Sequence, residues 1–152
     1  MIQVTFIGKP LHLYLSGWAM FQLDDIVHAW NEGHNLDERV TSIWNIIAGG
    51  TIISTDDEKR TIEFDPAETL DVLFRAVEIL STGGELARKA LGFEKGCTVT
   101  ADELRALATP RDLLTLRPAV ARALEEGYTS EAEKAVEIDI FAQEIQKKTT
   151  ND

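Results

Sequence analysis

The sequence predicts an α+β domain in which an N-terminal β-hairpin is followed by a mainly α-helical body, with a second small hairpin as a further element. Two observations lead to this prediction: the apolar residues of the first fifteen positions alternate, and later stretches repeat apolar residues at helical spacing between capping signals. A chain of 152 residues with 44% hydrophobic content is long enough to bury a conventional core. We expect residues 1–138 to form one globular domain, and residues 139–152 to form a C-terminal segment with a flexible polar end.

The predicted N-terminal hairpin is built from two short alternating stretches around a Gly-Lys-Pro turn at 8–10. Its apolar positions are Ile2, Val4 and Phe6 before the turn and Leu11, Leu13 and Leu15 after it. Because successive side chains of a strand point to opposite faces, each set covers one face of the hairpin.

Two helices are predicted next. The first spans about 18–32, where Leu23, Val27 and Trp30 share one face. The second runs from Asp37 to the glycine pair at 49–50, and its apolar stripe is Val40, Ile43, Trp44 and Ile47. We expect Trp30 and Trp44 to pack in the core. Trp18 lies beside Gly17 and is the tryptophan assigned to a partner surface.

The segments 51–54 and 60–64 flank an acidic connector and predict the second hairpin. A helix then starts at Asp65-Pro66, where Asp65 is expected to accept a hydrogen bond from the third helical amide and Glu68 completes a capping box. The pair Gly83-Gly84 is expected to end this helix, and a short segment continues to Gly92.

Two capping signals mark the helices of the last third. Thr100 begins a short helix, and Thr109-Pro110 begins a longer one that ends near Gly127. Pro118 is expected to kink the longer helix or to start a new first turn. In residues 134–146 the apolar residues fit a strand and a helix equally well, so the period leaves both open.

Charge and composition exclude several functional classes. The chain has 15 Lys and Arg against 26 Asp and Glu, a net charge of −11, and we find no basic patch. Binding to nucleic acid or to an anionic membrane is therefore not expected. With one cysteine, no signal-peptide pattern and no apolar run of about 20 residues, the expected location is the cytoplasm.

No residue set predicts catalysis, a cofactor or a metal. His12, His28 and His34 lack the i, i+4 spacing of a helical metal pair. Cys97 follows Lys95-Gly96, which could activate a thiol, but a half-buried loop cysteine is the favoured interpretation. The acidic pairs at 24–25 and 56–57 are interpreted as solvated surface. The glycine pairs at 49–50 and 83–84 lack the spacing of phosphate-binding loops.

Several stretches resemble the tail assembly chaperones of long-tailed bacteriophages and prophages. The resemblance begins with the hairpin from Val4 to Leu15, which runs into Gly17-Trp18-Ala19-Met20-Phe21-Gln22-Leu23-Asp24-Asp25. It continues in Ile43-Trp44-Asn45-Ile46-Ile47-Ala48-Gly49-Gly50, in Leu107-Ala108-Thr109-Pro110-Arg111-Asp112-Leu113-Leu114 and at 137–148. It spans nearly the whole chain, and its motifs are apolar patterns, not invariant chemistry. The hairpin around Asp56 and the loop at 96–97 do not match the family.

The resemblance implies a non-enzymatic protein that binds the tape-measure protein, helps tail-tube subunits to assemble, and is absent from the finished virion. Helix-in-groove packing suits such a partner. The family commonly makes a longer product by ribosomal frameshifting, and Gln146-Lys147-Lys148 is compatible with a slippery run of adenines. A homo-oligomer is also compatible with this role. The expected partner-binding residues are Trp18, Ile138, Ile140, Phe141 and Ile145.

A rival hypothesis is a small acidic regulator or inhibitor that engages a basic protein. The two hypotheses differ in their response to salt. Contacts between exposed charges are screened within about 10 Å at 0.1 M salt, so a charge-driven regulator should dissociate as salt rises. A chaperone that holds apolar helices should remain bound.

Overall fold

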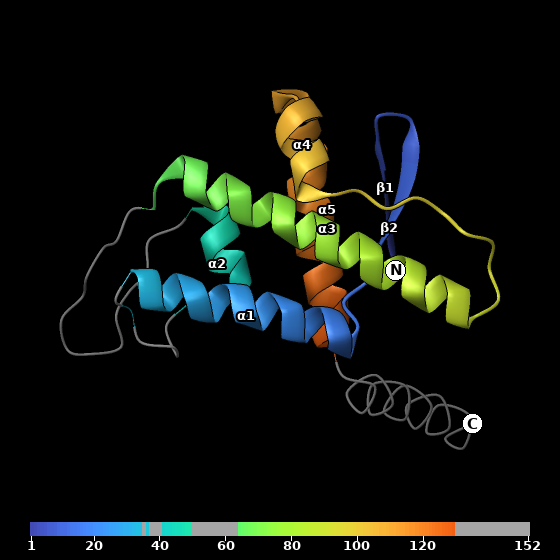
Figure 1. Ribbon diagram of the computed structural model, residues 1–152, viewed down its shortest axis with the longest axis horizontal. Helices are drawn as coiled ribbons and strands as arrows, with labels where there is room; N and C mark the ends of the chain where they lie inside the picture. The colour runs from blue at the N-terminus through green and yellow to red at the C-terminus, as the bar shows by residue number, and fades with distance from the viewer. Residues whose placement is uncertain (35, 37–40, 50–63, 130–152) are drawn as a thin grey trace, which may run out of the picture.

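The computed structural model describes residues 1–34, 36, 41–49 and 64–129. These residues form a two-stranded antiparallel hairpin followed by helices α1 to α5 (Figure 1). The predicted α+β class is therefore confirmed.

The hairpin consists of β1 (Ile2–Phe6) and β2 (Lys9–Leu13), paired from Ile2 with Leu13 to Phe6 with Lys9. Its turn is formed by Ile7 and Gly8, which have φ values of 52° and 70°. Two central residues with positive φ are typical of the two-residue turns that match the twist of antiparallel strands. The predicted Gly-Lys-Pro turn is thus displaced by one or two residues, and Lys9 and Pro10 belong to β2.

Helix α1 (Gly17–Gly33) agrees with its prediction to within one residue at each end. The Ser16 hydroxyl caps it by accepting a hydrogen bond from the Ala19 amide at 3.1 Å. Its inner face includes Leu23, Ile26 and Trp30, so the prediction that Trp30 packs in the core is confirmed.

Helix α2 (Ile43–Ala48) is shorter than predicted. It begins after Ser42, whose hydroxyl accepts from the Asn45 amide, and residues 37–40 lie outside the described residues. Gly49 ends it with a φ of 67°, as predicted. The prediction that Trp44 is buried was wrong: its side chain is 39% exposed, because the single buried face is taken by Ile43, Ile46 and Ile47.

Helix α3 (Pro66–Ala90) does not end at Gly83-Gly84. Both glycines are buried in its interior, where a Cβ on Gly84 would lie 1.7 Å from the His12 carbonyl oxygen and one on Gly83 would lie 2.8 Å from that of Tyr14. The pair therefore allows the helix backbone to approach β2 and the residue after it. The helix ends before Gly92, which has a φ of 85°.

The start of α3 also differs in detail from its prediction. Asp65 accepts a hydrogen bond from the Ala67 amide, one residue earlier than expected. The Glu68 carboxylate lies 3.1 Å from Nε2 of His34 and so joins α3 to the end of α1.

Helices α4 (Ala101–Leu107) and α5 (Pro110–Tyr128) begin at the predicted caps Thr100 and Thr109. Thr109 and Asp112 form a complete capping box. Pro118 does not start a new helix, because α5 continues through it without a break. Gly127 lies in the last turn, one residue before the end.

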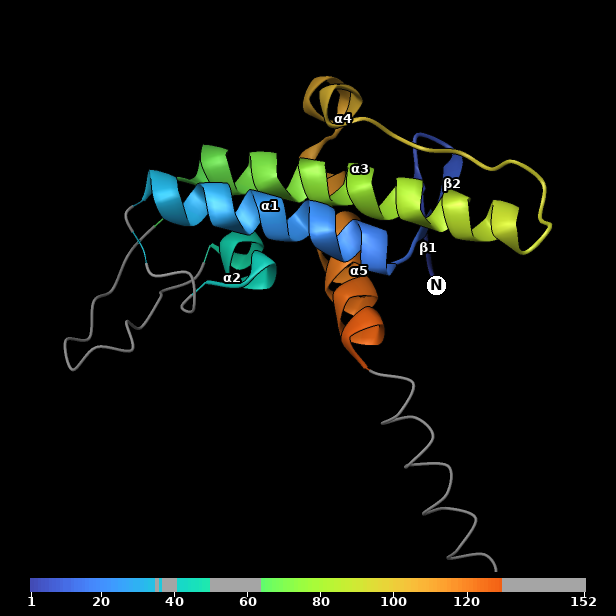
Figure 2. The ribbon, with the colours of Figure 1, turned by 60° about the horizontal axis from the view of Figure 1, so that its bottom comes forward.

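Helices α1 and α3 lie side by side, and α5 crosses beneath them (Figures 1 and 2). The hairpin packs against α3 and α5. The core is formed where these elements meet, and its fully buried side chains include Leu11, Leu13, Leu23, Ile46, Leu73, Leu80, Leu104, Leu116 and Val120. This arrangement leaves the outer face of α1 and the last turn of α5 on the surface.

Two predictions lie outside the described residues. They are the second hairpin, of which Phe64 alone is described and is buried, and the choice between helix and strand at 134–146. The predicted partner-binding residues Ile138, Ile140, Phe141 and Ile145 belong to the same undescribed C-terminal part.

Candidate protein-binding surface

Three exposed aromatic side chains are carried by the start of α1 and by the end of α5, which packs against Leu15 just before α1 begins. They are Trp18, Phe21 and Tyr128, with exposed fractions of 42%, 69% and 55%, and we call them the aromatic face. Isolated exposed hydrophobic residues are ordinary, but several large rings drawn from two elements are typical of protein-binding surfaces.

The spacing of α1 places Trp18 and Phe21 on its outer side. Residues three apart on a helix are neighbours, so these two rings lie over one stretch of surface. The opposite side of the same turns carries Ala19 and Leu23, both fully buried. The buried stripe is thus complete without Trp18 or Phe21, and the core has no need of either ring.

Helix α5 contributes Tyr128 because its last turn packs against Leu15, two residues before α1 begins. A Cβ on Gly127 would lie 2.4 Å from the Cβ of Leu15, so the absence of a side chain there permits the approach. Burial raises the pKa of the Tyr128 phenol, and the negative charge of Asp24 on α1 raises it further. The phenol is therefore protonated at neutral pH and is available as a hydrogen-bond donor.

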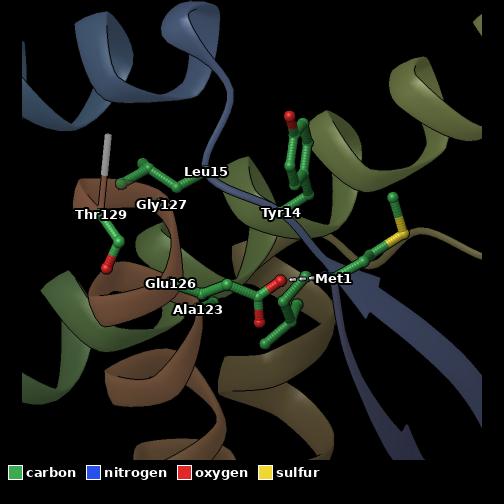
Figure 3. Close-up of a pocket in the computed structure, with 8 residues that line it drawn as sticks. Met1, Tyr14, Leu15, Ala123, Glu126, Gly127 and Thr129 are labelled. Atoms are coloured by element: carbon green, nitrogen blue, oxygen red, sulfur yellow. Dashed lines mark hydrogen bonds and ion pairs between the residues drawn. The ribbon is translucent and has the colours of Figure 1, made fainter. Parts of the chain in front are cut away.

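A small pocket of about 80 Å³ lies beside this junction (Figure 3). It is lined by Met1, Leu13, Tyr14, Leu15, Ala123, Glu126, Gly127 and Thr129. The amino group of Met1 forms an ion pair with the Glu126 carboxylate, which joins the first residue of the chain to α5. Small-molecule sites usually exceed about 300 Å³, so this pocket is too small for a cofactor.

The structure separates the residues that sequence analysis weighed as chemical candidates. His28 is exposed on α1 and lies 3.2 Å from Glu32. His34 stacks on Trp30 with ring centroids 4.2 Å apart. Cys97 is half-buried in a loop, as predicted, and its backbone pairs with that of Leu11.

A cluster that sequence analysis missed joins β2 to α3. Oε1 of Glu85 lies 3.6 Å from Nδ1 of His12 and 3.3 Å from Nε of Arg88. The other carboxylate oxygen accepts a hydrogen bond from the Gly96 amide at 2.7 Å. The sequence does place His12 at an outward-facing position of a strand. It does not show which residues His12 contacts, because Glu85 and Arg88 are distant from it in the sequence. The cluster fixes the loop after α3.

His12 and Cys97 do not form a nucleophilic pair, although the fold brings their backbones near each other. Cys97 pairs with Leu11, whose side chain is fully buried, whereas His12 faces Glu85 on the other side of the strand. Within the described ranges, no three His, Cys, Asp or Glu side chains are grouped so that they could hold a metal ion.

Among the helices described here, none is long and apolar enough to cross a membrane. Comparisons with models of known protein families, with curated proteins and with solved structures found no match.

Proposed function

We propose that this chain is a non-enzymatic tail assembly chaperone of a long-tailed phage or prophage. In this role it binds the tape-measure protein and assists assembly of the tail tube in the host cytoplasm, and it is absent from the finished virion. Two lines of reasoning support the proposal: the resemblance of its apolar patterns to that family, and a surface suited to an apolar helical partner.

The observation that carries the proposal is the aromatic face. Trp18 and Phe21 expose large rings that the core does not require, and Tyr128 adds a protonated phenol at their edge. Trp and Tyr are enriched among the residues that dominate binding energy at protein interfaces. An amphipathic helix of a long, helical partner could lay its apolar stripe across these rings.

The test is co-expression of the tagged chain with the tape-measure and tail-tube proteins encoded beside it, followed by capture at about 0.5 M salt. At that concentration, contacts that depend on exposed charge are screened. We expect the tape-measure protein to be retained. A variant with both Trp18→Ala and Phe21→Ala should retain at least about tenfold less tape-measure protein. Truncation of a residue that dominates an interface costs about 2 kcal/mol or more of binding free energy.

Trp44→Ala is the matched control. Trp44 is the same residue type and is 39% exposed, close to the 42% of Trp18, but it lies on α2. Retention should be unchanged in this variant. Equal losses in Trp44→Ala and in the variant with both Trp18→Ala and Phe21→Ala, or no capture of either tail protein, would contradict the proposal.

The acidic regulator is retained as a second candidate because Asp24 and Asp25 are exposed beside the aromatic face. Both carboxylates line a shallow depression on α1 together with Val27, His28 and Asn31. A basic partner could bind there through charge. In that case Asp24→Asn with Asp25→Asn would abolish binding at low salt, and 0.5 M salt would abolish binding to the unchanged chain as well.

A further inference from the structure

A second surface lies at the C-terminal end of α3. It is a groove of about 360 Å³ between the last turns of α3 and the loop that follows. Its lining residues are Thr82, Glu85, Leu86, Lys89, Phe93, Lys95 and Thr98. Leu86 and Phe93 form its apolar walls and are 53% and 58% exposed.

The groove carries positive charge in a chain whose net charge is −11. Lys89 and Lys95 are both exposed on its lining. The one lining carboxylate, Glu85, is already engaged by the Gly96 amide and the Arg88 guanidinium, so it does not cancel the two lysines. Glu94 is exposed nearby but is not part of the lining.

The wall formed by the loop is held in place. The Arg88 guanidinium lies over the Phe93 ring at 5.1 Å and donates a hydrogen bond to the Glu94 carbonyl oxygen at 3.3 Å. A Cβ on Gly96 would lie 2.4 Å from the Glu85 carboxylate, so glycine at this position leaves room for the carboxylate against the loop. The groove is therefore present without a ligand, and a bound segment would not have to form it.

The chain itself contains a segment of complementary chemistry. Residues 131–145 carry five carboxylates and one lysine, and their large apolar residues are Val136, Ile138, Ile140, Phe141 and Ile145. We propose that this groove binds the chain's own C-terminal segment, with apolar side chains between Leu86 and Phe93 and carboxylates facing Lys89 and Lys95. The proposal does not depend on the proposed function.

The segment has sufficient length to reach the groove. The end of α5 touches Leu15, and His12, three residues back along the chain, faces Glu85 on the groove lining. Three extended residues span at most about 11 Å, so the groove lies roughly 25 Å from the end of α5 once both contacts are included. Residues 130–138 can extend to about 30 Å. Ile138 and the residues after it can therefore reach the groove of the same molecule.

Chymotrypsin cleavage after Phe141 in the full chain tests the proposal. A synthetic peptide of residues 130–152 gives the cleavage rate of the unbound segment. We expect the full chain to be cleaved at this bond at least roughly tenfold more slowly than the peptide, because a docked bond must first be released. Exchange of Lys89→Glu with Lys95→Glu should restore most of the peptide's rate, since two attractive rim charges become repulsive.

Lys9→Glu is the matched control, because it makes the same charge change at an exposed position on the hairpin. It should leave cleavage after Phe141 slow. Leu86→Gln, which alters an apolar wall without changing charge, should accelerate cleavage and so tests the groove even if the double lysine variant fails to fold. Circular dichroism establishes that each variant is folded.

Three results would overturn the proposal. They are cleavage of the unchanged chain at the peptide's rate, acceleration by Lys9→Glu equal to that of the lysine pair, and protection that disappears on dilution. The last result would show that the segment docks on a second copy, because binding within one molecule is independent of concentration.

Discussion

The end of α2 and the seam between α3 and β2 both depend on glycine, but for different physical reasons. Gly49 has a φ of 67° and no neighbouring atom within 4 Å of the position a Cβ would occupy. Gly84 lies in regular helix, and its Cβ would lie 1.7 Å from a carbonyl oxygen of β2. Gly49 ends α2 because glycine tolerates a positive φ. Gly84 allows α3 to contact β2 because glycine has no side chain.

The difference shows why a glycine pair after an apolar helical stripe is an ambiguous signal. The same pattern predicted a helix end at both places, and it was right for α2 and wrong for α3. What distinguishes them is another strand, about seventy residues earlier in the chain, that occupies the space beside α3. Sequence around the glycines contains no trace of that strand.

Gly84→Ala should have the largest effect. The added methyl group would overlap the His12 carbonyl group, which is backbone and belongs to a paired strand. Overpacking costs typically about 1–3 kcal/mol, and a clash with backbone belongs at or above the upper end. We expect the free energy of unfolding to fall by about 3 kcal/mol or more, measured by urea denaturation. Gly17→Ala, at a site with no atom within 4 Å, is the control; equal stability of the two variants would refute close packing at the seam.

Gly127→Ala should have an intermediate effect. Its Cβ would lie 2.4 Å from the Cβ of Leu15, which is a side-chain neighbour and not a carbonyl. We expect a loss of roughly 2 kcal/mol in the free energy of unfolding. In a background of Leu15→Gly the same exchange should cost far less, because the opposing side chain is then absent. Additive losses in the double variant would mean that the two residues do not touch.

Gly49→Ala should have a smaller effect of a different kind. There is room for the methyl group, but an L-residue at this φ is strained by roughly 1 kcal/mol. Gly49→Asn should recover part of the loss, since asparagine tolerates the left-handed conformation. An asparagine variant less stable than the alanine variant would point to crowding and would remove the contrast with Gly84.

Tyr128→Phe should have the smallest effect, and it tests the burial of the Tyr128 phenol at the end of α5 and the effect of the Asp24 charge on it. Burial raises the pKa of Tyr128 above the ordinary value of 10.0. Stability linked to this group is therefore complete below pH 10 and declines as the pH rises through the folded-state pKa. The phenylalanine variant should lack that part of the alkaline loss in thermal denaturation from pH 8 to 11. Identical alkaline profiles would indicate that Tyr128 is fully solvated.

Much of the fold was predictable because its signals are local. The predicted caps at Thr100 and Thr109 depend on a hydroxyl within three residues of the amide from which it accepts a hydrogen bond. Alternation in the first fifteen residues specified the hairpin faces in the same way. The burial of Trp44 was predicted wrongly because the predicted apolar stripe included every apolar residue near one helix face. The six-residue helix buries only a narrower face, formed by Ile43, Ile46 and Ile47.

The candidate surface was predicted in part. Trp18 was singled out from its position beside Gly17, and it is exposed as expected. Phe21 and Tyr128 were not singled out. The place of Tyr128 depends on the end of α5 packing against Leu15, which is distant in sequence. Ile138, Ile140, Phe141 and Ile145 stay predictions, to be tested by cleavage and capture.

The sequence by itself determined the fold class, the hairpin, the starts of α1, α3, α4 and α5, and the negative charge, because each depends on residues within a few positions of one another or on composition alone. Tertiary structure decided which glycines end a helix and which lie against a strand, and it assembled the cluster of His12, Glu85 and Arg88. It also created the aromatic face and the lysine-rimmed groove. These features depend on elements distant in sequence, whose approach is set by packing of the whole core.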